Sequence, residues 1–193
     1  MIVVINYGAG NLRSITKAIE KIGKKATITN DPETIKAADA VVLPGVGAFE
    51  TAIKNLKEVI PFLKNTKTPI LGICLGMQLF ATISEEGGPH RGLDIIPGRV
   101  VRFPKSVGKI PHMGWNEVDF DDHYLFDGIR NRFFYFVHSY YLDTKENVIA
   151  YTDYGVRFPS AVAKENYVGV QFHPEKSGKN GLKLLENFFE NVT

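Results

Sequence analysis

The stretch PILGICLGMQ (residues 69–78) decides the fold of this chain. Its apolar first half is typical of a buried strand, and its GICLG segment predicts a sharp turn from that strand into a helix. Cys74 lies on the predicted turn, where Gly72 and Gly76 remove side chains that would crowd it. A helix that begins at Leu75 would point free N–H groups at the sulfur and favour its thiolate.

The first half of the chain alternates between strand and helix patterns. Asn11 can cap one helix, which Gly23 ends. Strands are expected at residues 2–6, 25–30, 40–43 and 69–74, with helices at 12–22, after Asp31, up to Glu58 and from Leu75 to about Ile83. Repeated strand–helix–strand units predict an α/β fold with an open, mostly parallel, flavodoxin-like sheet and helices on both faces. Ligands bind such sheets at the carboxyl ends of the strands.

The second half is rich in strand patterns and has little helix. Strands are expected at residues 99–103, 114–120, 133–142, 148–152, 160–164 and 167–172, with a turn within 121–129. The short gap at Glu165-Asn166 predicts a hairpin, so antiparallel strands extend the sheet. Ser177 can cap a final helix. We find no linker or repeat and therefore assign residues 1–193 to one domain.

His173 and Glu175 form the second chemical element. They follow an apolar strand, and Pro174 between them opposes a helix. Side chains two residues apart on an extended segment point the same way, so Glu175 can hold His173 in one tautomer. A lone cysteine in an apolar stretch is usually a small buried hydrophobe. The glycine frame and this His-Glu pair instead favour Cys74 as a nucleophile.

The PGVG loop (residues 44–47) ends a strand of the same parallel half. It should reach the same rim of the sheet as Cys74 and present backbone N–H groups there. One of these, with the N–H of Leu75, could hold an oxyanion. Gln78 lies four residues after Cys74, on the same helix face and near the predicted pocket.

Composition limits the other classes of function. A net charge of +2 on 193 residues gives no electrostatic case for binding nucleic acid or a membrane surface. No segment approaches a membrane span, and the apolar start is too short for a signal peptide, so a cytoplasmic protein is expected. One cysteine and five scattered histidines show no metal-ligand spacing, and no cofactor is expected.

These residues together resemble the class I (triad) glutamine amidotransferase family, essentially from end to end. The shared triad motifs are GICLGMQ (72–78) and HPE (173–175). Within the family, the chain most closely resembles glutaminase subunits of histidine biosynthesis. That narrower similarity rests on NYGAGN (6–11), PGVG (44–47), PHMGWN (111–116), HSY (138–140) and HPEKS (173–177).

The resemblance implies hydrolysis of glutamine to glutamate and ammonia by a triad of Cys74, His173 and Glu175. It also implies an oxyanion hole formed by the N–H groups of Leu75 and of Val46 or Gly47. The amino-acid end of glutamine would be held by Gly47, Gln78, Ser139 and Tyr140.

The resemblance further implies a separate partner subunit, a cyclase of (β/α)₈ barrel fold, that consumes the ammonia in a heterodimer. Asn11, Trp115 and Lys176 are the candidates for the surface that faces it. Glutaminase subunits of pyridoxal phosphate or anthranilate type synthases share the triad and remain alternatives. A freestanding cysteine amide hydrolase, which needs no partner, is a third alternative.

Overall fold

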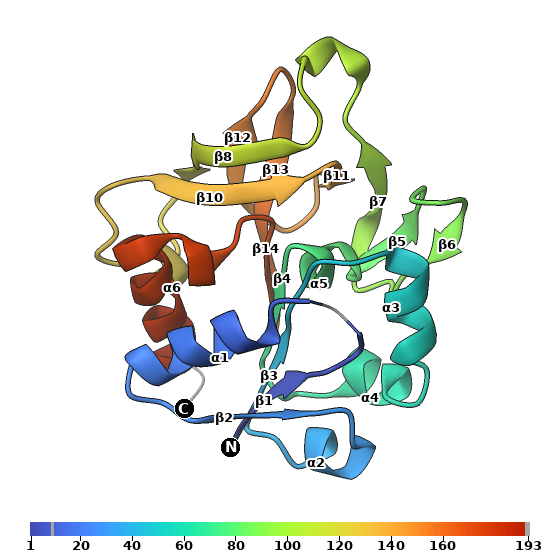
Figure 1. The fold of residues 1–193 in the computed structure, drawn as a ribbon, viewed down its shortest axis with the longest axis vertical. Coiled ribbons are helices and arrows are strands. Elements are labelled where there is room, and N and C mark those ends of the chain that lie inside the picture. Colours follow the sequence, from blue (N-terminus) through green and yellow to red (C-terminus); the bar gives the residue numbers. More distant parts are fainter. Residues whose placement is uncertain (9, 192–193) are drawn as a thin grey trace.

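The computed structural model describes residues 1–8 and 10–191, and these form a mixed eight-stranded sheet (Figure 1). Ala9 of the NYGAGN motif therefore lies outside the described residues. The strand order is β2-β1-β3-β4-β14-β13-β12-β9. The strands are β1 (Ile2–Ile5), β2 (Ala26–Thr29), β3 (Ala40–Leu43), β4 (Ile70–Ile73), β9 (Asp119–Phe120), β12 (Val148–Asp153), β13 (Arg157–Lys164) and β14 (Tyr167–Val170).

The pairing of these strands confirms the predicted fold class. The five strands from β2 to β14 in the sheet order are parallel, and β13, β12 and β9 extend the sheet in antiparallel fashion. The hairpin between β13 and β14 turns at Glu165, which has a φ of +52°. β1, β3, β4 and β14 are buried on both faces, which explains why their sequences are continuous apolar runs.

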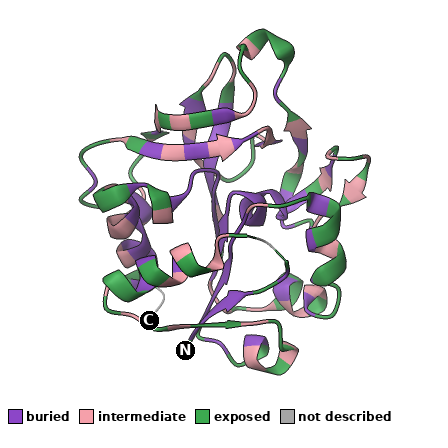
Figure 2. Ribbon diagram, viewed as in Figure 1, coloured by how far each residue is buried: buried purple, intermediate pink, exposed green. Residues whose placement is uncertain are grey.

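Helices cover both faces of the parallel half. α1 (Leu12–Lys21) and α6 (Gly178–Asn191) pack on one face, and α2 (Pro32–Lys36), α3 (Phe49–Asn55) and α4 (Ile60–Asn65) pack on the other (Figure 1). The central strands are buried, while the outer sides of the helices are exposed (Figure 2). No described helix is long and apolar enough to cross a membrane.

Two smaller sheets stand at the carboxyl edge of the parallel strands. One is a ribbon of β8 (His112–Glu117) and β10 (Phe133–His138), and the other has the order β11-β7-β5-β6. Its strands are β5 (Ala81–Ser84), β6 (His90–Arg91), β7 (Ile96–Arg102) and β11 (Tyr140–Asp143). The 3₁₀ turns are η1 (Lys105–Val107), η2 (Tyr124–Phe126) and η3 (Pro174–Lys176), and η2 matches the turn expected within 121–129.

The helix expected from Leu75 to about Ile83 is wrong. α5 spans only Leu75–Gln78, and strand β5 follows almost at once. The reason is a later segment of the chain that packs against this one. The N–H of Asp94 donates to the carbonyl of Ala81, and the N–H groups of Ile95 and Ile96 donate to the carbonyl of Phe80. Those carbonyls are then unavailable to helical N–H groups.

Two further predictions need correction. The strand expected at 133–142 is divided at Ser139 into β10 and β11, which belong to different sheets. Here the His138 ring bonds the carbonyl of Tyr140 at 2.8 Å, which turns the chain. The helix expected up to Glu58 ends at Asn55, and α4 follows it without having been predicted.

Candidate active site

Cys74 lies at the carboxyl end of β4, on the predicted corner between strand and helix. Its φ of +52° belongs to the left-handed region that L residues rarely adopt, and its side chain is buried. A Cβ on Gly72 would come within 2.7 Å of the Gly76 backbone, and one on Gly76 would collide with the carbonyl of Leu43. The two glycines therefore allow the close packing that holds Cys74 in this conformation.

His173 and Glu175 meet as predicted, although by a different local geometry. The Nδ1 of His173 lies 2.8 Å from Oε1 of Glu175, and both side chains are almost fully buried. Pro174 begins the 3₁₀ turn η3, so the segment is not extended. Proline is compatible with the first position of such a turn because its missing N–H has no partner there. Since the carboxylate can only accept, Nδ1 carries a proton and Nε2 faces the remaining chemistry.

Asn11 supplies a second donor to the same carboxylate oxygen. Its Nδ2 lies 2.5 Å from Oε1 of Glu175. The side chain makes no capping hydrogen bond to α1, which differs from the expected helix cap, and the residue has a φ of +74°. Asn11 therefore links the start of α1 to the carboxylate of Glu175.

Ser177 also departs from its predicted role as a cap. Its hydroxyl accepts a hydrogen bond from the N–H of Tyr135 at 3.0 Å and donates one to the carbonyl of His173 at 2.6 Å. The hydroxyl therefore ties η3 to β10 and fixes the backbone that carries His173.

The electrostatics of the site favour a charged imidazole. Burial alone would lower the pKa of His173, but negative charge on Cys74 and the hydrogen bond to Glu175 outweigh it and raise that pKa. Nε2 of His173 is buried and has no hydrogen-bond partner among the described residues. This nitrogen is thus available to carry a proton to and from a reacting group.

The predicted oxyanion hole is not open. The N–H of Leu75 donates to the carbonyl of Gly45 at 3.4 Å, so it does not point at a substrate. Val46 and Gly47 do line the same cavity as Cys74. The loop would have to turn the Gly45 carbonyl away before the Leu75 N–H could bind an oxyanion.

A cavity of about 330 Å³ opens at Cys74. The predicted substrate residues Gly47, Gln78, Ser139 and Tyr140 all lie in its wall. Glu86, which the sequence analysis did not single out, lies there too. Burial raises the pKa of Glu86, and the hydrogen bond from the N–H of Phe49 offsets only part of this rise. Glu86 lies just after β5, a strand that the sequence did not predict.

Gln171 was also missed. Its side chain is fully buried, and its Nε2 lies 3.4 Å from the sulfur of Cys74. The signal that could have identified it is its spacing, because residues 171 and 173 are two apart just after a strand.

The outer face of the β8–β10 ribbon carries exposed apolar side chains. Met113 and Trp115 are each 56% exposed, and Phe133 is 46% exposed. Trp115 contacts Tyr135 edge to face, and Nζ of Lys176 lies 5.8 Å from the centre of the Tyr135 ring. Two of the three residues predicted to face a partner therefore share this surface, whereas the side chain of Asn11 turns toward Glu175.

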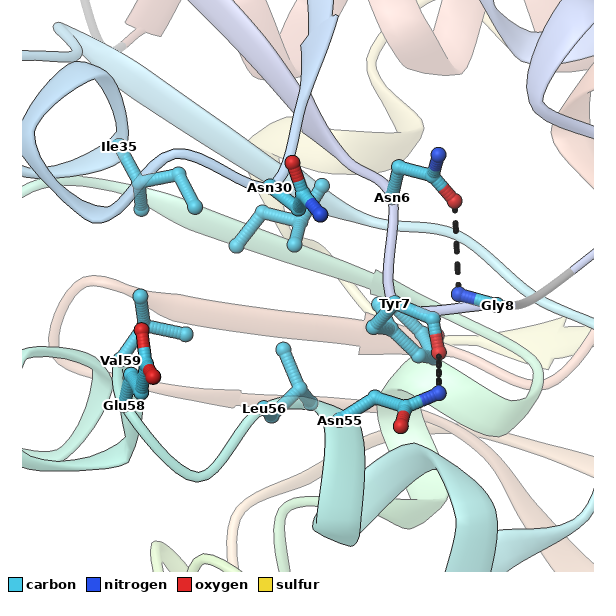
Figure 3. A pocket seen from close by; sticks show the side chains of 10 residues that line it. Asn6, Tyr7, Gly8, Asn30, Ile35, Asn55, Leu56, Glu58 and Val59 are labelled. Carbon is cyan, nitrogen blue, oxygen red and sulfur yellow. Dashed lines mark hydrogen bonds between the residues drawn. The ribbon is translucent and has the colours of Figure 1, made fainter.

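A second and larger cavity, of about 460 Å³, lies beside the ends of β1 and β2 (Figure 3). Its polar lining comes from Asn6, Asn30, Asn55 and Glu58. Asn55 donates to the carbonyl of Tyr7 at 2.9 Å. None of the residues that line it is a cysteine or histidine, so the chemistry points to the smaller cavity. The described residues also contain no group of three or more His, Cys, Asp or Glu that could hold a metal ion.

The fold and this site define a class of protein that the comparisons identify. The model of the glutamine amidotransferase class-I family matches residues 3–192, and the chain belongs to that family. A crystal structure of a glutamine amidotransferase shares the fold, with a TM-score of 0.75, 19% identity and coverage of 100% of this chain and 99% of that one.

Curated relatives narrow the similarity further. Imidazole glycerol phosphate synthase subunit HisH from Archaeoglobus fulgidus is 60% identical over 191 residues, which cover 97% of each chain. The protein of the same name from Carboxydothermus hydrogenoformans is 53% identical over 198 residues, covering 98% of this chain and 99% of that one.

Proposed function

We propose that this chain is the glutaminase subunit of an imidazole glycerol phosphate synthase and hydrolyses glutamine to glutamate and ammonia. The observation that carries the proposal is the buried His173–Glu175 pair beside Cys74, whose sulfur lines a cavity of amino-acid size. The named relatives support the particular synthase.

The reaction follows from the protonation states of the three groups. The thiolate of Cys74 attacks the side-chain amide carbon of glutamine, and His173 donates its Nε2 proton to the departing nitrogen. Ammonia leaves and a glutamyl thioester remains. His173, now neutral at Nε2, takes a proton from water, and the resulting hydroxide attacks the thioester. Glutamate leaves, and Cys74 and His173 return to their starting states. Glu175 keeps the ring oriented throughout.

The wall of the cavity fits the amino-acid end of glutamine. Nε2 of Gln78 donates to the carbonyl of Tyr140 at 2.8 Å and to Oε1 of Gln171 at 3.2 Å. Both amide protons of Gln78 are thus occupied, and its oxygen can accept a hydrogen bond from the substrate ammonium. The carboxylate of Glu86 adds a negative charge for the same group, while Gly47 and Ser139 complete the wall.

The oxyanion is stabilised only after the PGVG loop rearranges. Leu75 then supplies one N–H, and Val46 or Gly47 supplies the other. Because the Gly45 carbonyl occupies the Leu75 N–H, the free subunit should hydrolyse glutamine slowly. Activity would rise when a docked partner favours the rearranged loop.

A partner is expected because ammonia released into water at neutral pH becomes ammonium, which is not a nucleophile. The partner would be a cyclase of (β/α)₈ barrel fold that docks on the exposed face of the β8–β10 ribbon. Trp115 and Lys176 would contact it. Asn11 lies nearby, with its side chain hydrogen-bonded to Glu175 of η3. An exposed tryptophan among apolar neighbours is a frequent anchor of such an interface. A cytoplasmic location is consistent with a nucleophilic cysteine that must stay reduced.

The test is glutamate release from glutamine under three conditions. These are the chain alone, the chain with the cyclase barrel, and the chain with the barrel and its phosphorylated ribulosyl substrate. We expect a large rise in the last condition. Trp115→Ala should reduce the rise without changing the activity of the chain alone, and the exposed Ile28→Ala is the matched control. Equal activity in all three conditions would indicate a freestanding amide hydrolase.

A further inference from the structure

Two polar contacts to the sulfur of Cys74 have no predicted role. One is the carbonyl of Val137, which lies 3.9 Å from the sulfur and can only accept a hydrogen bond, so the other contact is the only one of the two that can donate. Nε2 of Gln171 lies 3.4 Å from the sulfur of Cys74. α5 is a single turn whose first N–H, from Leu75, is taken by Gly45. The N–H of Leu75 therefore does not donate to the sulfur here. The Gln171 carboxamide does.

The orientation of the Gln171 carboxamide is fixed by its neighbours. The carbonyl of Tyr140 can only accept, so the Gln78 atom facing it at 2.8 Å is the amide nitrogen. That same nitrogen faces Gln171 at 3.2 Å, which requires the Gln171 oxygen on that side. The nitrogen of Gln171 is then left to face Cys74. The amide thus presents an N–H to the sulfur.

The carbonyl of Tyr140 is itself held by a buried histidine pair. Nδ1 of His138 lies 2.8 Å from this carbonyl and must donate to it, which leaves Nε2 of His138 as an acceptor. Nδ1 of His112 lies 3.0 Å from that acceptor and donates to it. Nε2 of His112 is therefore an acceptor as well.

The half-buried Asn116 completes the chain from the other end. Its oxygen accepts from the N–H of Glu117 at 2.8 Å, so its nitrogen lies toward the carbonyl of Asp153 and toward Nε2 of His112, at 3.0 and 3.1 Å. The donor at this end agrees with the acceptor derived from the Tyr140 end. Each hydrogen bond from Asn116 to Cys74 therefore has a donor and an acceptor assigned without conflict, with the carbonyl of Tyr140 accepting from both His138 and Gln78.

We propose that Gln171 is a catalytic residue that donates a hydrogen bond to the Cys74 thiolate. We further assign Gln78, His138 and His112 as positioning residues that hold the Gln171 carboxamide in the donating orientation. The proposal deepens the proposed function, because it rests on Cys74 as the nucleophile. It also joins the β8 strand, beside Trp115, to the reacting sulfur by a continuous run of hydrogen bonds.

The test uses the fact that Cys74 is the sole cysteine of the chain, so alkylation by iodoacetamide reports on it alone. Gln171→Met keeps the volume and removes the donor, and Gln171→Glu replaces the donor with a charge. We expect the pH midpoint of alkylation to rise by about one unit in Gln171→Met and further in Gln171→Glu. Alkylation needs no glutamine turnover, so this result is independent of whether glutamine is the substrate.

The matched control is Asn187→Leu, which removes another buried amide far along α6. Asn187 donates to the carbonyls of Leu125 and Asp127, so its loss should lower the free energy of unfolding and leave the alkylation midpoint unchanged. Folded Gln171 variants whose midpoints stay within about 0.3 unit of the native protein would overturn the proposal.

The positioning role is tested at His138. His138→Phe removes the donor to Tyr140 and should raise the midpoint. His138→Asn places an amide nitrogen near the former Nδ1 and should restore the midpoint. Equal midpoints in both variants would contradict the positioning role.

A measurement on the native protein tests the proposal even if the Gln171 variants fail to fold. With ¹⁵N-labelled glutamine side chains, the Gln171 amide signal should shift when Cys74 is alkylated, because the acceptor changes from thiolate to thioether. An unchanged Gln171 signal would overturn the proposal.

Discussion

The first and second halves of the chain contribute differently to the site. The parallel strands β1, β3 and β4 form a buried frame and deliver one reactive atom, the sulfur of Cys74. The two smaller sheets and the segment after β14 deliver the groups that surround it, including His138, Gln171 and His173. In the proposed mechanism, a buried frame therefore holds the nucleophile, and the second half of the chain supplies the groups that exchange protons and hydrogen bonds with it.

The largest effect on this comparison is expected at Glu175. Glu175→Gln keeps the shape of the side chain but removes the charge that orients His173, so kcat should fall by about 10³-fold. The measurement is steady-state glutamate release in the activated complex, with Glu146→Gln, an exposed residue, as the control. A loss below about threefold would mean that Cys74 and His173 act without the carboxylate.

In the second half of the chain, buried and exposed aromatic side chains should contribute differently to the free energy of unfolding. Phe172 is fully buried against Phe134 and Phe136, so Phe172→Ala should lower the free energy of unfolding by about 3–5 kcal/mol. Phe133→Ala, on the exposed face of the ribbon, should change it by less than about 0.5 kcal/mol. Denaturant unfolding of both variants checks the contrast, and similar losses would show that the outer face also supports the fold.

Acid should weaken the half that contains the histidine pair. Burial lowers the pKa of His138 to about 3 and that of His112 to about 4, below the unfolded value of about 6.5. The unfolded chain then binds more protons, so this stabilisation is present above pH 6.5 and is lost as pH falls toward 4. Through the protonation of these two residues, the free energy of unfolding should fall by roughly 3 kcal/mol between pH 6.5 and pH 5.

Unfolding measured at several pH values tests this. His112→Phe should lose about half of the pH dependence in that window. An unchanged slope in that variant would show that His112 does not stay neutral in the folded protein.

The smallest of these effects is expected at Asn11. Asn11→Ala removes a hydrogen bond to a buried carboxylate, so kcat should fall by about tenfold with KM little changed. The control is Asn180→Ala, which removes the hydrogen bonds from another side-chain amide to the carbonyls of Asn131 and Phe133. This variant should leave kcat unchanged. An effect of Asn11→Ala on KM alone would place Asn11 in substrate binding.

The same contrast explains what the sequence could predict. Strands β1, β3 and β4 are short apolar runs with turn and glycine signals between them, so local patterns sufficed for these strands and for the Cys74 corner. His173 and Glu175 followed from their position after an apolar strand. These features depend on neighbours in the sequence.

The errors lie where distant residues decide the structure. α5 stops at Gln78 because a chain segment near residue 95 takes the next carbonyls, and β10 ends at His138 because its ring bonds Tyr140. Gln171 and Glu86 reach the site through contacts with residues far away in the sequence. The two-residue spacing to His173 is the one local signal for Gln171, and the sequence around Glu86 offers none.

The most direct test of the account is glutamine hydrolysis by Cys74→Ala in the complex with the cyclase barrel and its substrate. We expect a folded protein that binds the barrel as the native chain does and releases glutamate at least about 10⁴-fold more slowly. Substantial hydrolysis by Cys74→Ala would contradict this mechanism, because a group other than the Cys74 thiolate would then have to be the nucleophile.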